Sequence, residues 1–241
     1  MQERYLGDVH DYYKFLFLKS LSEKLKKKIG LNWYLVDPEE ISASEQKKKD
    51  GEKRNYLNKY EIYNLDLKIS NEFKKIVDKK NRNIENFTNQ THLKSYINFF
   101  NKRIQHSNRK QWFKESIEFF KNNEVIFLDP DNGLLKSKYN KNPSKYLLLD
   151  EIDIYLSKRK IVIFTQFQSY NKTHIIYLKE IKNYLKLNNI EILLPIIRNR
   201  TAPNTFFITL CDRKMKDKER IISFYEVYER KMPETIELIT V

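Results

Sequence analysis

The feature that most constrains the fold of this chain is a short apolar run that ends abruptly in a polar loop. The run is Val125-Ile126-Phe127-Leu128, and it is followed at once by Asp129-Pro130-Asp131-Asn132-Gly133. An apolar run of this length, stopped by Pro and Gly, is typical of a buried strand that leads into a sharp turn. Ligands of α/β sheets bind at the carboxyl ends of strands, so the carboxylates and the amide of this loop are well placed for chemistry. A turn in which Asp and Asn cap their own backbone explains the same residues without any function.

Strand and helix patterns alternate along much of the chain. Apolar runs predict strands at 31–36, 125–128, 160–166, 190–197, 205–210 and 236–241. Apolar residues at three- and four-residue spacing predict helices at 11–28, 65–78, 109–121, 144–156, 173–187 and 217–229. This alternation predicts an α/β fold with a doubly wound, Rossmann-like sheet. Because no linker rich in Pro, Gly or Ser divides the chain, we expect residues 1–241 to form a single domain.

Two segments depart from this alternation. Residues 41–60 are polar and charged, which predicts a mobile charged loop within the domain. Residues from about 79 to 107 are rich in Asn, Lys and aromatic residues, and we expect an inserted helical subregion there. At the end of the first predicted helix, the lysines at 26–28 suit the negative end of the helix dipole. Gly30 is the predicted cap of that helix.

The chain is strongly basic, with 46 Lys and Arg residues against 32 Asp and Glu and a net charge of +14. A positive field of this size attracts polyanions, so the predicted partner is nucleic acid, either RNA or DNA. The single cysteine, Cys211, excludes an internal disulfide and a cysteine-based zinc site. No apolar stretch has the length of a membrane span, and the N-terminal residues lack the apolar core of a signal peptide. A cytoplasmic location without membrane contact is therefore expected.

The usual nucleotide-binding motifs are missing. The chain has only four glycines, which form neither a GxGxxG nor a Walker A loop. The candidate site residues are therefore acids near predicted strand ends and in the N-terminal segment: Asp8, Asp11, Asp37, Glu39, Asp129, Asp131, Asp150 and Glu151. Asp37 and Asp129 directly follow strands, so a parallel sheet would bring them to one edge, although they could also cap the next helices. Gln166 and Gln168 follow at the same edge and could contact a base or only bridge loops.

Two short motifs resemble a known enzyme family. The run from Gly7 to Phe15 resembles the opening GNxxDxxKH element of the bacterial 23S ribosomal RNA adenine methyltransferases whose catalytic motif is DPPY. Gly7, Asp11 and Lys14 match in register, while Asp8 replaces Asn and Phe15 replaces His. Later in the chain, Phe127-Leu128-Asp129-Pro130-Asp131-Asn132 stands where that family has a strand followed by DPPY.

The resemblance implies a class I S-adenosylmethionine-dependent methyltransferase with a helical insertion in its sheet domain. By this resemblance Asp129 would accept hydrogen bonds from the target amino group, with Asp131 and Asn132 completing the catalytic loop. Asp11, Lys14 and Asp37 would lie beside the cofactor, S-adenosylmethionine. The sequence departs from the family in two places. Asp37-Pro38-Glu39-Glu40 replaces the glycine-rich cofactor loop, and Asp131 and Asn132 replace the second Pro and the aromatic residue that grip the base.

The same loop has a second likeness. Asp129-Pro130-Asp131 resembles the DxD loop of Toprim domains, which bind magnesium for phosphoryl transfer. By that resemblance Asp129 and Asp131, with Glu39 or Glu40 after the first strand, would hold Mg²⁺ or Mn²⁺ and activate water against a phosphodiester. Three interpretations therefore remain: a divergent methyltransferase that acts on a base amino group, a metal-dependent nuclease, and a non-catalytic nucleic-acid-binding protein.

Overall fold

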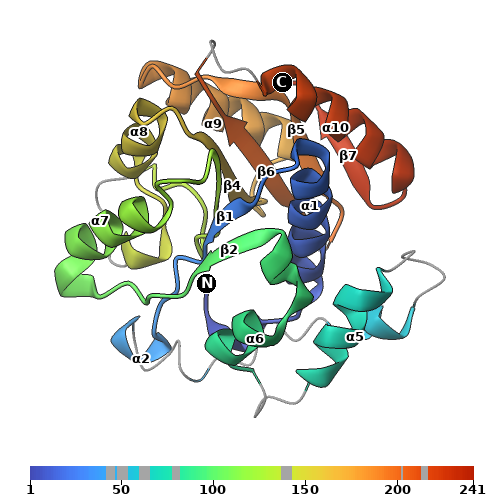
Figure 1. Cartoon of the computed structure of the whole chain (residues 1–241). Helices are drawn as coiled ribbons and strands as arrows, with labels where there is room; N and C mark the ends of the chain where they lie inside the picture. The colour runs from blue at the N-terminus through green and yellow to red at the C-terminus, as the bar shows by residue number, and fades with distance from the viewer. Residues whose placement is uncertain are drawn as a thin grey trace.

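Helices cover both faces of one mixed sheet in the computed structural model (Figure 1). The structure describes residues 1–41, 47, 54–59, 66–77, 82–136, 143–201, 203–212 and 217–241. Within these ranges seven strands follow the order β2-β1-β3-β4-β6-β5-β7. Their bounds are β1 Ile29–Asn32, β2 Ile97–Phe100, β3 Val125–Leu128, β4 Ile161–Phe167, β5 Ile192–Asn199, β6 Thr205–Leu210 and β7 Ile236–Ile239. Strands β1 to β4 are mutually parallel, whereas β6 runs antiparallel to both β4 and β5, and β7 antiparallel to β5.

Eight α-helices are present in the described part of the chain. They are α1 Val9–Leu25, α2 Pro38–Ile41, α5 Leu67–Lys75, α6 Ile84–Gln90, α7 Arg109–Phe119, α8 Leu149–Ser157, α9 His174–Leu187 and α10 Lys218–Lys231. Buried side chains of α1, α5, α6 and α10 pack on one face of the sheet, and those of α7, α8 and α9 pack on the other. The α/β, Rossmann-like architecture predicted from the sequence is therefore confirmed.

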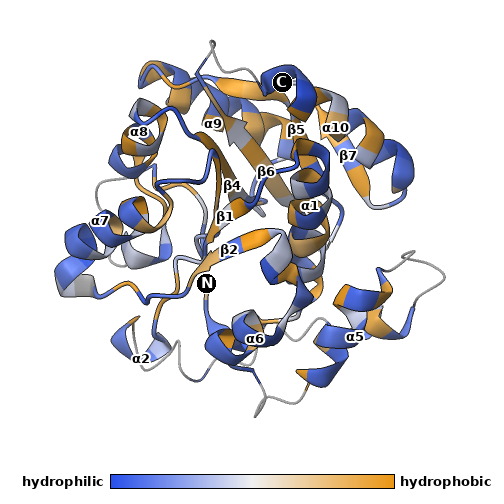
Figure 2. Ribbon diagram, viewed as in Figure 1, coloured by the Kyte–Doolittle hydropathy of each residue, from blue (hydrophilic) through white to orange (hydrophobic). Residues whose placement is uncertain are grey.

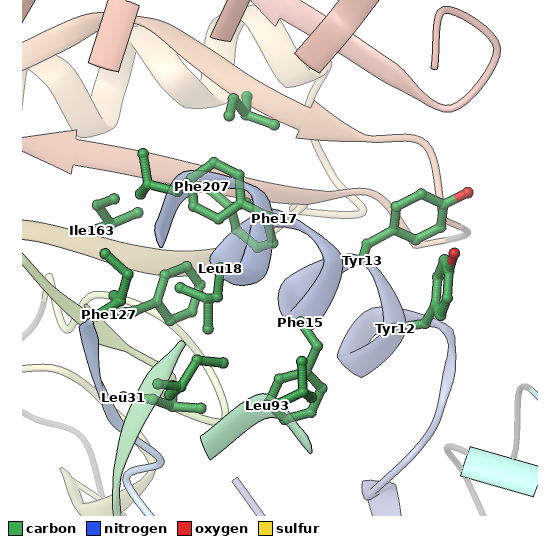
Figure 3. Close-up of a cluster of buried hydrophobic side chains, with 14 of the residues drawn as sticks. Tyr12, Tyr13, Phe15, Phe17, Leu18, Leu31, Leu93, Phe127, Ile163 and Phe207 are labelled. Atoms are coloured by element: carbon green, nitrogen blue, oxygen red, sulfur yellow. The ribbon is translucent and has the colours of Figure 1, made fainter. Parts of the chain in front are cut away.

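The two faces of the sheet form two separate apolar clusters because strand side chains alternate in direction. In β3, Phe127 belongs to the α1 side, while Ile126 and Leu128 belong to the α7–α9 side. Figure 3 shows Phe17 and Leu18 of α1 close to Phe127 on the first face. Figure 2 shows hydrophobic residues along the strands and many hydrophilic residues on the outer sides of the helices. Burial on both faces explains why β3 is uniformly apolar.

The first strand and the end of the first helix differ from the prediction. Strand β1 occupies Ile29–Asn32 instead of 31–36, and Gly30 lies inside it, so its prediction as a helix cap was wrong. Helix α1 ends at Leu25, and Lys26 takes the left-handed cap conformation with φ of 56°. A Cβ atom at Gly30 would lie 2.6 Å from Cδ1 of Phe120, so glycine is required here for close packing.

The segment expected to be a helical subregion also supplies an edge strand. Helix α6 does lie there, but residues 97–100 form β2, which pairs in parallel with β1. The prediction was therefore wrong for these residues. Most of the predicted loop at 41–60 falls outside the described residues, whereas residues 55–58 form a 3₁₀ turn. No described helix combines the length and apolarity needed to cross a membrane.

Candidate functional site

A cavity of about 410 Å³ lies at the carboxyl edge of the parallel strands, beside the first turns of α1. Its walls come from α1, from the loop after β3 and from the end of β4, with further residues near the start of β6. The backbone N–H of Asp129 donates to the carbonyl of Asn32 at 2.9 Å, which fixes the start of the loop to the end of β1. The volume falls within the range of small-molecule sites, roughly 300–1,000 Å³. We call this cavity the acidic pocket because Asp8, Asp11, Asp129 and Asp131 line it.

Lys14 is the centre of the acidic pocket. Its Nζ donates to Oδ1 of Asp11 at 2.6 Å and to Oδ2 of Asp129 at 2.5 Å, and its side chain is only 4% exposed. Asp11 and Lys14 are three residues apart on α1, so they lie on the same helix face. The hydroxyl of Thr165 donates to the other oxygen of Asp129 at 2.9 Å. Segments more than a hundred residues apart in sequence therefore meet at one buried ammonium group.

Burial and charge determine the protonation of this cluster. Burial raises the pKa of Asp11 to about 6, although the Lys14 ammonium acts in the opposite direction. Burial likewise raises the pKa of Asp8 to about 6, despite the backbone N–H of Asp11 that its carboxylate accepts. For Lys14, burial acts to lower the pKa, but Asp11 and Asp129 outweigh it and raise the pKa above the usual lysine value. Lys14 is therefore a permanent cation, and Asp8 and Asp11 are acids that gain protons just below neutral pH.

Asp131 is held by cations of its own. Its carboxylate accepts from Nε2 of Gln2 at 2.8 Å and lies 3.2 Å from Nζ of Lys145 and 3.5 Å from the α-amino group of Met1. Burial acts to raise the pKa of Asp131, but the positive charges of Met1 and Lys145 outweigh it and lower the pKa. Asn132 lines the same pocket, and its backbone N–H donates to the carbonyl of Lys145 at 2.9 Å. The loop after β3 is thus held both by the backbone hydrogen bond of Asn132 and by the contacts of the Asp131 carboxylate.

The structure does not bring Asp37 or Glu39 into the pocket. Oδ2 of Asp37 accepts from Nη1 of Arg103 at 2.7 Å, and its Oδ1 accepts from the backbone N–H of Glu39 at 3.0 Å, which makes it a local cap. Neither residue lines the acidic pocket. The reason is that β1 ends at Asn32, and the buried, non-strand residues 33–36 carry the chain away before Asp37. The acidic pocket brings together six of the predicted candidates: Asp8, Asp11, Lys14, Asp129, Asp131 and Asn132.

The described residues include no group of three or more His, Cys, Asp or Glu side chains arranged to hold a metal ion. Asp129 and Asp131 both line the pocket, but each already has a basic partner. A divalent cation on Asp129 would have to approach within a few ångströms of the Lys14 ammonium, which electrostatic repulsion opposes.

Several pocket residues were not predicted from the sequence. They are Tyr5, His10, Lys145, Thr165, Phe167, Tyr170 and Phe207. Thr165 precedes the predicted strand-end residue Gln166, and this position was its only sequence signal. His10 lies within the Gly7–Phe15 motif, whereas the remaining residues come from segments without a motif and are brought together by tertiary packing. Gln166 itself fastens loops: its Oε1 accepts from the N–H of Leu134 at 2.8 Å, and its Nε2 donates to the hydroxyl of Tyr177 at 2.7 Å.

Two structural devices hold the pocket loops. Gly133 adopts φ of 77°, and a Cβ there would lie 2.3 Å from Oε1 of Gln166, so the loop after β3 requires glycine at this point. Arg109 forms a bidentate ion pair with Glu151, at 2.7 and 2.8 Å, and its guanidinium also donates to the carbonyls of Pro143 and Tyr146. The second device fixes the segment that carries Lys145.

No family model, curated protein or solved structure matches this chain.

The acidic pocket has the side chains that S-adenosylmethionine would require. That molecule carries a sulfonium and an ammonium group, which carboxylates stabilise, a carboxylate that suits a lysine, and an adenine ring that suits aromatic side chains. In the pocket, Asp11 would meet the first need, Lys145 the second and Phe167 the third. The segment after β1 does not offer a binding surface for this cofactor, because Trp33 and Tyr34 are fully buried there and Asp37 lies outside the pocket.

Proposed function

We propose that the protein is a methyltransferase-like enzyme that acts on the amino group of a nucleobase, with the acidic pocket as its active site. The observation that carries the proposal is the position of Asp129: it is buried at the end of β3, and its carboxylate is fixed by Lys14 and Thr165 beside a cavity large enough for a small molecule. A carboxylate held in this way still has lone pairs that can accept hydrogen bonds from an amine.

Aromatic side chains around the pocket support a planar ligand. Tyr5, Phe167 and Phe207 line the cavity, and Tyr170 lines it while being 87% exposed. A base removed from a stack is held by stacking on such rings and by hydrogen bonds to its edge. Residues 129–133, directly after β3, include no aromatic residue, so the stacking surface at the pocket would come from β4 and its following loop.

The residues of the pocket have distinct parts in this proposal. Asp129 accepts the amino hydrogens of the base and so orients the nitrogen lone pair. Lys14 and Thr165 hold the Asp129 carboxylate in place through their hydrogen bonds. Asp11 and Lys145 would bind the charged end of the cofactor. When bound, S-adenosylmethionine supplies an electrophilic methyl group, and the nucleophilic nitrogen needs orientation more than a strong base.

The proposal is tested by calorimetric titration of the protein with S-adenosylmethionine and with adenosine, each without and with Mg²⁺ or Mn²⁺. We expect both compounds to bind without metal. The Asp129→Asn variant should bind adenosine about 10- to 100-fold more weakly, because a hydrogen bond to a charged group contributes roughly 1.5–3 kcal/mol. Asp37→Asn is the matched control and should bind both compounds like the wild type, since Asp37 lies outside the pocket.

Other outcomes would replace the proposal. Metal binding that is lost in Asp129→Asn, without binding of S-adenosylmethionine, would favour phosphodiester cleavage. If neither metal nor small molecule binds, the non-catalytic interpretation is favoured, with nucleic acid bound through the surface charge alone.

A further inference from the structure

A second hollow adjoins the acidic pocket. It has a volume of about 480 Å³ and shares Asp131, Asn132 and Phe167 with the first cavity. Its other walls come from residues 134–136, from the end of β4 and from the first turns of α9. We call it the outer groove. The acidic pocket and the outer groove are therefore neighbours, and Asn132 lines both.

Lys136 is the cation of the outer groove. Its side chain is 35% exposed, and its Nζ lies 4.7 Å from the ring centroid of Tyr177. Its ion pair with Glu180 spans 4.0 Å, whereas the same carboxylate accepts from Lys172 at 2.6 Å. Burial lowers the pKa of Lys136, although the Glu180 carboxylate acts in the opposite direction. The attraction of Glu180 is therefore smaller than the loss of hydration that the Lys136 ammonium suffers on burial. An anion in the groove would stabilise this ammonium group.

Tyr177 adds a hydrogen-bond donor beside this cation. Its hydroxyl accepts from Nε2 of Gln166 at 2.7 Å, and Gln166 is fixed in turn by the backbone N–H of Leu134. A phenol that accepts one hydrogen bond keeps its own proton for donation. Tyr146 also lines the groove and presents a second aromatic ring. An ammonium group, a phenol and aromatic rings together suit a phosphate and the base attached to it.

We infer that the outer groove binds the phosphate and the neighbouring nucleotide of a single-stranded nucleic acid whose target base occupies the acidic pocket. This inference rests on the proposed function, because it assumes a nucleobase in the first cavity. Because Asn132 lines both cavities, the sugar of the target nucleotide would lie beside this residue and the adjoining phosphate beside Lys136. The ligand class is thereby narrowed from a free nucleoside to a strand of at least two nucleotides.

The test compares the affinity of the protein for adenosine with its affinity for the dinucleotide adenylyl-adenosine. We expect the dinucleotide to bind about 10-fold more tightly, the contribution of one charged hydrogen bond. Lys136→Ala should remove this advantage and leave the adenosine affinity unchanged. Lys172→Ala is the matched control, because Lys172 contacts the same Glu180 without lining the groove. Tyr177→Phe retains the ring and should lower only the dinucleotide affinity.

The outcomes separate the two proposals. If adenosine binds but the dinucleotide binds no more tightly, or if Lys136→Ala has no effect on it, the groove inference is overturned and the proposed function stands. If the dinucleotide binds through Lys136 while adenosine does not bind, the groove is supported and the use of the acidic pocket for a base is overturned. If neither binds, both fail. The salt dependence of binding gives a second readout. In Lys136→Ala, the slope of the logarithm of the dinucleotide binding constant against the logarithm of salt concentration should be smaller in magnitude by about 0.7, the value for one phosphate contact of a single strand.

Discussion

Replacing Lys14 with Met tests the electrostatic account of the acidic pocket. The substitution keeps a long side chain but removes the ammonium group that lies 2.6 Å from Asp11 and 2.5 Å from Asp129. Removing one partner of a buried ion pair lowers the free energy of unfolding by about 3–5 kcal/mol, because a buried charge is left without compensation. A domain has about 5–15 kcal/mol in total, so the variant should fold with much reduced stability.

The cost of Lys14→Met should depend on Asp11. In the double variant Asp11→Asn/Lys14→Met one of the two carboxylates is gone, while the Asn oxygen can still accept from the N–H of Gly7. We expect the double variant to be more stable than Lys14→Met alone, with a coupling free energy of about 1–3 kcal/mol. The assay is urea unfolding of the wild type, both single variants and the double variant at pH 7. Lys24→Met, on the exposed last turn of α1, is the control and should change stability by less than about 0.5 kcal/mol.

The pH dependence follows from the same contacts. The pKa of Asp11 is about 6 even with Lys14 present, and without Lys14 it should rise further. A carboxyl whose folded pKa is raised destabilises the fold as the pH rises above its unfolded pKa, because the folded state must then release a proton that it binds more tightly. The stability deficit of Lys14→Met should therefore be larger at pH 8 than at pH 5. A deficit that is independent of pH, together with additive effects of the two substitutions, would refute the buried-charge explanation.

Two further substitutions test local features of the site. Asp8→Asn keeps the cap on the N–H of Asp11, since Asn caps helices as well as Asp, but removes a buried acid whose pKa is about 6. Below pH 4 the free energy of unfolding of the variant should equal that of the wild type, and above pH 6 it should be higher by as much as about 3 kcal/mol. A difference that does not grow between these pH values would contradict the raised pKa of Asp8. Gly133→Ala should destabilise by about 2–4 kcal/mol, from its φ of 77° and the loss of the Gln166 hydrogen bond. Adding Gln166→Ala should reduce the effect of Gly133→Ala to the backbone strain alone, as measured by urea unfolding.

Strands with sharp ends were predictable. Both β3 and β6 have the bounds expected from their apolar runs, because polar or turn-forming residues follow each of them closely. Helix α9 begins one residue later than predicted, since Thr173 is its N-cap and accepts from the N–H of Ile176. In these elements the local pattern and the tertiary environment favour the same structure, so the sequence alone is sufficient.

The elements near β1 were less predictable because tertiary packing decides them. Gly30 has a low intrinsic preference for strands, yet Phe120 packs so closely against it that no larger residue fits. Strand β2 is an apolar run of four residues, Ile97–Phe100, within a segment rich in Lys and Asn. No Pro or Gly marks its ends as Pro130 and Gly133 do for β3, and its partner β1 lies far away in sequence.

The candidate site was predictable where two independent signals agreed. Asp129 follows a well-defined strand, and Asp11 and Lys14 have helical spacing within a recognisable motif, and all three meet in the structure. Asp37 had only its position after a strand, and the actual strand ends five residues earlier. Lys145 contacts Asp131 from a segment that Arg109 and the backbone of Asn132 hold in place, and such a contact has no local sequence signal.

The charges of the acidic pocket argue for a ligand that donates hydrogen bonds. Lys14 is one cation shared between Asp11 and Asp129, so this part of the cluster carries a net negative charge when both acids are ionised. A divalent ion would meet the fixed ammonium group, whereas an amino group only needs the remaining lone pairs of Asp129. The raised pKa of Asp11 also favours a hydrogen-bond donor as the ligand. Burial destabilises the ionised Asp11 carboxylate, and a donor beside it would stabilise that ionised form. A basic surface can collect nucleic acid non-specifically, whereas a buried carboxylate with a fixed cation beside it has the lone pairs that an amine donor needs.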